Sequence, residues 1–226
     1  MKRRGQMKVK VNIRRATEKD HSFLAWVIFR ATQSHLEKCP WPTILDEDEG
    51  GSLNFLEHLV CTGPSHWCHL SRFWIAEAED KPIAAMSSYI PDKHGNDVLE
   101  RAAFQVISEL GYSELRINSI LERLLALESG FPDDLPGAWG IECVAVDPEY
   151  QGLGIVDMLF EQVQQEALKE GFKRAQILCL IGNTAAEKAW KRNGFTVQGE
   201  YLNADFEALI GTPGVKRFVK ELKHER

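Results

Sequence analysis

A short turn in the second half of the chain contains residues suited to binding an anion. Gly152 and Gly154 lie between an apolar run that ends at Val146 and an amphipathic run that begins at Ile155. Glycine allows a ligand to approach the backbone closely, and the free N–H groups at a helix N-terminus attract negative charge. The turn therefore predicts a phosphate or pyrophosphate site. Its spacing matches neither the Gly-x-x-x-x-Gly-Lys-Ser/Thr loop of nucleoside triphosphate sites nor the Gly-x-Gly-x-x-Gly loop of dinucleotide sites.

A single carboxylate, Glu142, interrupts the apolar run that precedes this turn. An ionised carboxylate is costly to bury unless it is paired or used, and burial raises its pKa toward a value suited to taking a proton from an ammonium group. Two interpretations follow. In the first, Glu142 is a general base. In the second, it pairs with a neighbouring Arg or Lys, or lies exposed beyond the edge of a sheet.

Four cysteine and histidine residues lie close together in the first half of the sequence: Cys61, His66, Cys68 and His69. Their spacing matches no common zinc pattern, and no Cys-x-x-Cys pair is present to complete one, so we expect no metal. The chain has five cysteines, an odd number, and Cys143 and Cys179 stand in apolar runs. This pattern indicates reduced core thiols rather than a disulfide framework, as in cytoplasmic proteins.

The turn needs a strand before it and a helix after it, and the periodicity of the sequence supplies both. Residues 139–146 are typical of a short buried strand, and residues 155–170 carry an apolar stripe at helical spacing. Elsewhere we expect strands over 9–16, 73–78, 82–90, 173–181, 196–201 and 215–222, helices over 17–35, 53–60, 98–110, 113–127 and 184–191, and an irregular, turn-rich stretch over 39–51. The order strand, helix, strand after residue 139 implies a parallel crossover.

Bulk composition fits one domain over residues 1–226. The chain is 44% hydrophobic and 27% charged, with a formal net charge of -6. A net negative charge disfavours general binding to nucleic acid or to an anionic membrane, and it mildly favours a cationic partner. The first residues lack the apolar stretch typical of a signal peptide, so we expect none, and no apolar run approaches the roughly 20 residues of a membrane span. We therefore expect a cytoplasmic protein with no nucleic-acid or membrane partner.

Two segments, in the same order and at a similar separation, resemble motifs of the GNAT superfamily of acyltransferases. Val-Asp-Pro-Glu-Tyr-Gln-Gly-Leu-Gly-Ile over 146–155 resembles the Gln/Arg-x-x-Gly-x-Gly/Ala signature that follows the family's fourth strand. The run from Asn183 to Gly194-Phe195 resembles the family's Asn-x-x-Ala-x-x-x-Tyr-x-x-x-Gly-Phe element. The resemblance is clear over residues 139–201, plausible for the first strand, the first helices and the hairpin, and absent over 92–135.

The resemblance implies a fold of the α+β class, an α/β/α sandwich. We expect a twisted mixed sheet of about seven strands with flanking helices and a helical insertion, about 92–137, between the third and fourth strands. The fourth strand should part from its parallel neighbour, which leaves backbone groups free to pair with a ligand.

The resemblance also implies acetyl-CoA as co-substrate. The backbone of 144–146 would lie along the pantetheine arm, the amides of 152–157 would surround the pyrophosphate, and Asn183 would hold the far end of the cofactor or act as a helix N-cap. The cofactor-binding residues implied in this way are Val144, Ala145, Val146, Gln151, Gly152, Leu153, Gly154, Ile155, Val156, Asp157, Asn183 and Trp190.

Three residues depart from the family pattern. Val156 replaces a Gly or Ala, Asp157 brings a negative charge near the expected phosphates, and Trp190 replaces a Tyr that often serves as general acid. The first two departures bear on cofactor affinity and the third on catalysis. A thiol with a pKa near 8.5 leaves without full protonation, so loss of the Tyr weakens the case for catalysis without removing it.

We expect an N-acetyltransferase that moves the acetyl group directly to a primary amine of a small-molecule or peptide acceptor, with Glu142 as base and no metal. One alternative is a catalytically degenerate acyl-CoA-binding or regulatory protein of the same fold. Another is an interaction module, built on the helical block over 98–127, that forms a homodimer. The identity of the acceptor is left open, because specificity in such folds depends on variable helices and insertions.

Overall fold

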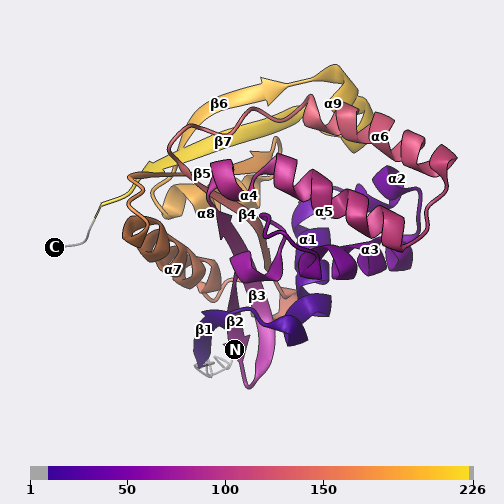
Figure 1. The fold of residues 1–226 in the computed structure, drawn as a ribbon. Helices are drawn as coiled ribbons and strands as arrows, with labels where there is room; N and C mark the ends of the chain where they lie inside the picture. Colours follow the sequence, from indigo (N-terminus) through magenta and orange to yellow (C-terminus); the bar gives the residue numbers. More distant parts are fainter. Residues whose placement is uncertain (1–9, 224–226) are drawn as a thin grey trace, which may run out of the picture.

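Strands from both halves of the chain pair into a mixed sheet. The computed structural model describes residues 10–223, and within that range the sheet has seven strands in the order β1-β2-β3-β4-β5-β7-β6 (Figure 1). The strands are β1 (Val11–Arg15), β2 (Phe73–Ala78), β3 (Lys81–Tyr89), β4 (Trp139–Val146), β5 (Arg174–Leu180), β6 (Thr196–Leu202) and β7 (Gly214–Glu221). The predicted α+β class and the number of strands are confirmed, while Val9, expected to begin the first strand, lies outside the described residues.

The parallel pair β4 and β5 separates along its length. The strands are paired from Trp139 opposite Ala175 to Ile141 opposite Ile177, and the register ends there. The other neighbouring strands of the described sheet pair antiparallel. The later half of β4 therefore has β3 on one side and no strand on the other, which confirms the predicted divergence.

Helices cover both faces of the sheet. The first face carries α1 (His21–Gln33), which begins after the 3-10 helix η1 (Glu18–Asp20) and packs on β4, together with α2 (Trp41–Leu45) and α3 (Glu49–Cys61). The opposite face carries α7 (Ile155–Lys169), which contacts β1 to β4, and α8 (Thr184–Arg192). Figure 1 shows α7 on the other side of the sheet from α1 and α3.

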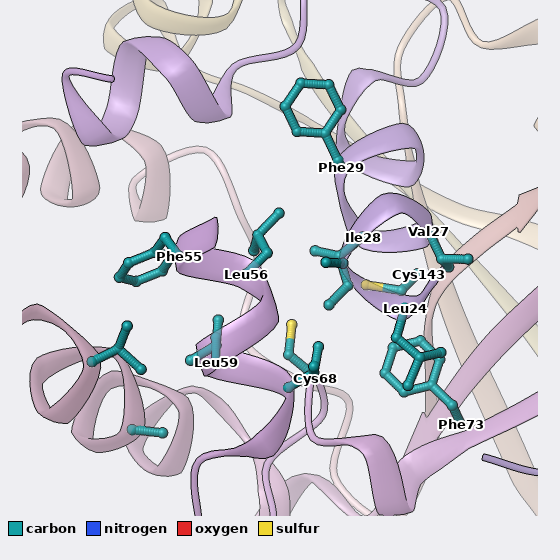
Figure 2. Close-up of a cluster of buried hydrophobic side chains, with 14 of the residues drawn as sticks. Leu24, Val27, Ile28, Phe29, Phe55, Leu56, Leu59, Cys68, Phe73 and Cys143 are labelled. Atoms are coloured by element: carbon teal, nitrogen blue, oxygen red, sulfur yellow. The ribbon is translucent and has the colours of Figure 1, made fainter. Parts of the chain in front are cut away.

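The core under the first face is built from helical apolar stripes. Leu24 and Ile28 recur at helical spacing on α1, and both are fully buried against α3 and the sheet. Figure 2 shows Ile28 facing Leu56 of α3, with Cys143 of β4 beside Leu24. This cluster fixes β4 from one side and thereby positions the strand that carries Glu142.

The segment between β3 and β4 is helical, as expected. It contains α4 (Pro91–His94), α5 (Asn96–Glu109) and α6 (Glu114–Glu128), and α5 and α6 are separated at Gly111, whose φ is +67°. The helix α5 packs on α3, and α6 packs on α2 and on α9 (Ala204–Ile210). The insertion therefore lies on the same side of the sheet as α1 and α3.

Three short helices, α2, α4 and α9, were not predicted individually. The helix α2 lies within the stretch expected to be irregular, where Pro42 near its start suits the first turn of a helix. The helix α9 begins after Asn203, whose side chain accepts hydrogen bonds from the amides of Asp205 and Phe206. The 3-10 helices η2 (Leu70–Arg72) and η3 (Pro148–Tyr150) complete the described elements. In the described part of the chain, every helix is too short or too polar to cross a bilayer.

Candidate active site

One cavity of about 2010 Å³ is bordered by β4, β5, the start of α7, the helix α8 and the helical insertion. Typical pockets for one small molecule measure roughly 300–1,000 Å³, so this cavity has room for two reactants side by side. Glu142 and eleven of the twelve residues predicted to bind the cofactor line it. The exception is Leu153, whose side chain is 49% exposed and does not border the cavity.

A β-bulge in β4 shapes the wall of this cavity. Ser87 of β3 pairs with Glu142 and Ala85 pairs with Ala145, so three steps along β4 correspond to two steps along β3. The extra residue distorts the backbone at Cys143, whose φ of +49° is rare for a residue with a side chain and costs about 1–3 kcal/mol. The sequence contained no signal for this bulge.

The glycine turn presents free amides to the cavity. Gly152 and Gly154 have φ values of +78° and +77°, and a β-carbon at Gly152 would have no atom within 4 Å. The positive φ of both residues is therefore what favours glycine here. The space around Gly152 is open, so a ligand can approach the backbone. Among the described residues, no acceptor is found for the amides from Gly152 to Val156, as is usual at a helix N-terminus.

Asp157 does not bring an unbalanced charge to the turn. Its carboxylate accepts from Nη2 of Arg192 at 2.8 Å and from Nδ2 of Asn193 at 2.7 Å. Hydrogen bonding to Arg192 lowers the pKa of Asp157 below its usual value. Arg192 itself lines the cavity and is 56% exposed, so its guanidinium is also within reach of a ligand. The sequence analysis missed Arg192, although it lies directly before Asn193 in the second motif.

Asn183 and Trp190 lie at the two ends of α8. Asn183 Oδ1 accepts from the amide of Ala186 at 3.0 Å, which confirms the N-cap, and its Nδ2 donates to Ser34 Oγ at 2.6 Å. The ring of Trp190 stands edge-on to Phe160, with 5.3 Å between centroids. Trp190 is 6% exposed, and its indole N–H has no partner among the described residues. Both side chains border the cavity.

Glu142 lines the cavity without a partner. No hydrogen bond or ion pair to its carboxylate is found in the described part of the chain, so neither an Arg nor a Lys neutralises it there. Burial and the negative charge of Asp134 raise the pKa of Glu142 from 4.5 to about 8. A carboxylate with this pKa is able to exchange a proton near neutral pH.

Asp134 comes from the loop after α6, and two other strands hold it in place. It accepts a hydrogen bond from Tyr89 Oη of β3 at 3.1 Å and another from Gln176 Nε2 of β5. Gln176 also accepts from the amide of Leu135 at 2.8 Å. Sequence reasoning missed this network, because Asp134 stands in the block without family resemblance. In residues 10–223, no group of three or more His, Cys, Asp and Glu side chains is arranged to hold a metal ion.

Several solved structures share this fold. An acetyltransferase superposes with a TM-score of 0.67 at 16% identity, over 94% of this chain and 100% of that chain. An N-acetyltransferase from Staphylococcus aureus Mu50 gives 0.64 at 19% identity, over 92% and 99%. An aminoglycoside acetyltransferase in complex with coenzyme A gives 0.54 at 16% identity, over 94% and 95%. At these identities the likeness establishes the fold.

Sequence comparison identifies the family. No curated protein matches the chain. The model of the acetyltransferase (GNAT) family, in contrast, matches residues 41–195, which is more than half of the chain and includes the glycine turn, Glu142 and α8. The resemblance inferred from the two motifs is thereby confirmed, and the chain belongs to the acetyltransferase (GNAT) family of acetyl-CoA-dependent enzymes.

Proposed function

We propose that this enzyme transfers an acetyl group from acetyl-CoA directly to a primary amine, with Glu142 as the general base. The observation that carries the proposal is the position of Glu142: an unpartnered carboxylate with a pKa of about 8 borders the same cavity as the free amides of the glycine turn. Transfer of an acetyl group from a phosphate-bearing carrier to an ammonium acceptor requires an anion site and a proton acceptor in the same cavity.

The geometry supports a binding mode for acetyl-CoA. The amides from Gly152 to Val156 donate to the pyrophosphate at the start of α7, and Arg192 balances the charge of Asp157 beside them. The pantetheine arm pairs with the backbone of residues 144–146, where β4 has left β5. Asn183 and Trp190 border the cavity from α8 and contact the cofactor from that side.

The chemistry is a single displacement at the thioester carbonyl. Glu142 takes a proton from the ammonium group, directly or through water, and the free amine attacks the carbonyl carbon. The new C–N bond forms and the C–S bond then breaks. Between these two events the carbonyl oxygen carries a negative charge, and a backbone N–H of β4 donates a hydrogen bond to it. The thiolate departs without a strong acid, because a thiol has a pKa near 8.5, and the second proton that the nitrogen loses on becoming an amide ends on this thiol.

A structural neighbour supports an amine acceptor. The aminoglycoside acetyltransferase with this fold acts, as its name states, on an aminoglycoside. The net charge of -6 agrees with a cationic acceptor, which the ammonium form of an amine provides. A small molecule and a peptide both satisfy this description.

The proposal is tested by the release of thiol from acetyl-CoA with a panel of amines, for the wild type and for Glu142→Gln. We expect kcat to fall by about 10²–10⁴-fold in the variant, the usual contribution of a general base, while the affinity for acetyl-CoA stays within twofold. Glu149→Gln, which changes a carboxylate of η3 outside the cavity, is the matched control and leaves kcat unaltered. Equal turnover of Glu142→Gln and wild type would remove Glu142 from the mechanism.

A second candidate function is binding of acyl-CoA without turnover. The observation in its favour is Trp190, which replaces the usual Tyr and is packed against Phe160, so α8 presents an indole where a proton donor is often found. The pairing of Asp157 with Arg192 weakens the case, since the charge of Asp157 is balanced. Saturable binding of acetyl-CoA with no thiol release on any amine of the panel would favour this candidate.

A further inference from the structure

A hydrogen bond joins the two sides of the gap between β4 and β5. Pairing of these strands ends at Ile141 and Ile177. The helix α1 packs on β4 and has Ser34 as its C-cap, while Asn183 follows β5 and is the N-cap of α8. Asn183 Nδ2 donates to Ser34 Oγ at 2.6 Å, and both residues border the cavity. The bond therefore connects segments attached to different strands, across the region where the strands no longer pair.

The residues beside Ser34 make further contacts with the segment that follows β5. The ring of His35 lies against Gly182, because a β-carbon on Gly182 would stand 2.8 Å from His35 Nε2. The Nδ1 atom of the same ring is 3.3 Å from Ser34 Oγ. Leu36 packs against the small apolar cluster that includes Phe206 of α9. The end of α1 is thus attached to this segment by a hydrogen bond, a ring contact and an apolar contact.

Asn183 itself is fixed from the side away from α1. Thr212 Oγ1 donates to the carbonyl of Ile181 at 2.7 Å, which anchors the chain just before Asn183. Asn183 Oδ1 accepts from the amide of Ala186 at 3.0 Å. A side-chain amide has two N–H donors on its nitrogen, and Ser34 takes one of them. The second N–H of Asn183 is then held in a defined direction and is able to donate to a ligand in the cavity.

Ser34 adopts this position with a strained backbone. Its φ and ψ are +56° and -123°, a conformation that glycine adopts freely and residues with a side chain rarely adopt. Such strain persists only where the surrounding structure holds it, and it is common at functional sites. The hydroxyl that accepts from Asn183 is what glycine would lack at this position. The strain is therefore coupled to the contact across the gap.

We propose that Ser34 is a positioning residue for acetyl-CoA: it orients the amide of Asn183 toward a carbonyl of the pantetheine arm and ties α1 to α8 across the gap that receives this arm. The inference rests on the proposed binding mode of acetyl-CoA and adds a residue to it that neither sequence motif contains. Because the contact concerns the arm, a ligand that carries only the phosphates of the cofactor does not depend on Ser34.

The test compares the Kd of acetyl-CoA with that of adenosine 3′-phosphate 5′-diphosphate, which has the phosphates of CoA but no pantetheine arm. Ser34→Gly and Ser34→Ala both remove the hydroxyl. We expect the Kd of acetyl-CoA to rise about fivefold in each variant, which corresponds to the usual contribution of one hydrogen bond. The Kd of the diphosphate should stay within twofold of the wild type. Titration calorimetry measures both values.

Urea unfolding of the same variants separates positioning from stability. Glycine relieves the strain at position 34 and alanine keeps it, so Ser34→Gly should have the higher free energy of unfolding of the two. The Kd of acetyl-CoA should nevertheless be the same in both. Glu79, with a φ of +51° in the exposed turn between β2 and β3 and outside the cavity, is the matched control. Glu79→Gly and Glu79→Ala should differ in stability in the same direction and keep the Kd of the wild type.

A double-variant cycle tests whether Ser34 acts through Asn183. Serine is as good an N-cap as asparagine but has no amide, so Asn183→Ser keeps the cap and loses the donor. Adding Ser34→Gly to Asn183→Ser should weaken the binding of acetyl-CoA no further. Fully additive losses, equal losses for acetyl-CoA and the diphosphate, or a Kd that follows stability would each overturn the inference.

The same titrations distinguish this inference from the proposed function. If the wild type binds acetyl-CoA and the Ser34 variants bind it equally well, the inference fails and the proposed binding mode stands. If the Ser34 variants lose affinity as expected but no amine is acetylated, Ser34 keeps its role and the proposed transfer fails. If the wild type does not bind acetyl-CoA, both fail.

Discussion

Asp134 and Glu142 interact as two like charges at the wall of the cavity, although one lies in a loop and the other in β4. The charge of Asp134 adds to burial in raising the pKa of Glu142 to about 8. Asp134 is held in place by Tyr89 Oη at 3.1 Å and by Gln176. The proton affinity of the proposed base therefore depends on a loop residue that two strands, β3 and β5, keep in position.

The first prediction concerns the pH dependence of kcat. A general base acts when deprotonated, so kcat of the wild type rises with pH and levels off above about pH 8. Asp134→Asn removes the neighbouring negative charge, which lowers the pKa of Glu142, and the rising limb moves to lower pH. The amide oxygen of Asn can still accept from Tyr89 and Gln176, so the network is kept. The measurement is kcat with saturating substrates from pH 6 to 10.

Asp80→Asn serves as the control for this experiment. Asp80 lies in the turn between β2 and β3, outside the cavity, at a φ of +60° that Asn tolerates. The same loss of charge at this distance leaves the limb where it is in the wild type. If both variants keep the limb of the wild type, Asp134 does not act on the base.

The second prediction concerns stability. Between pH 4.5 and about 8, the folded protein keeps a proton on Glu142 that the unfolded chain has released. The folded state then binds more protons, so the free energy of unfolding falls as pH rises through this window and is constant above it. Gln does not titrate, and Glu142→Gln is therefore more stable than the wild type at pH 8.5, by a few kcal/mol at most, since one pKa unit corresponds to about 1.36 kcal/mol.

Urea unfolding at two pH values checks this prediction. The difference in free energy of unfolding between Glu142→Gln and wild type should be large at pH 8.5 and should nearly disappear at pH 5. A difference that is the same at both values would mean that the carboxylate does not carry a raised pKa. The gain in stability together with the loss of kcat would identify Glu142 as a residue retained for function at the expense of stability.

Local patterns explain which parts of the site could be predicted. The strand β4, the glycine turn and α7 follow from apolar runs, helical periodicity and the conformational freedom of Gly152 and Gly154, and each depends on a few consecutive residues. The N-cap role of Asn183 was one of two predicted roles for the same reason. The fold followed once two such motifs matched one family.

Long-range relationships could not be predicted in this way. Asp134 reaches Glu142 through the packing of a loop on Tyr89 and Gln176, which belong to two other strands. The bulge at Cys143 depends on the register of β4 with β3. Arg192 and Asp157 are 35 positions apart and meet only because α8 packs beside the start of α7. No periodicity of one segment encodes any of these contacts.

The third prediction separates the two roles of the glycine turn. Gly152 and Gly171 have similar φ values, +78° and +84°, and a β-carbon at either would have no atom within 4 Å. Alanine is strained at both positions, so Gly152→Ala and Gly171→Ala should lose similar free energies of unfolding, about 1–2 kcal/mol. Gly152 borders the cavity and Gly171 does not, so the affinity for acetyl-CoA should fall at least tenfold in Gly152→Ala alone. Titration calorimetry measures it, and equal affinity in both variants would show that the turn does not hold the cofactor.

The fourth prediction concerns the pair of Arg192 and Asp157 beside the turn. Arg192→Ala leaves the negative charge of Asp157 in the first turn of α7 without a cation to balance it, and this charge repels phosphate, so the affinity for acetyl-CoA should fall about tenfold. Lys188→Ala removes the same charge from an exposed position on α8 outside the cavity and is the control, with affinity unchanged. An equal loss in the two variants would show a general charge effect instead.

Adding Asp157→Asn to Arg192→Ala distinguishes how the arginine acts. If its main role is to neutralise Asp157, removing the carboxylate as well should restore most of the affinity for acetyl-CoA, because the amides from Gly152 to Val156 are then free of a competing negative charge. If the double variant binds as weakly as Arg192→Ala, the guanidinium acts on the phosphates itself. We expect the first result, since Arg192 donates to both carboxylate oxygens of Asp157 and has little reason to leave them.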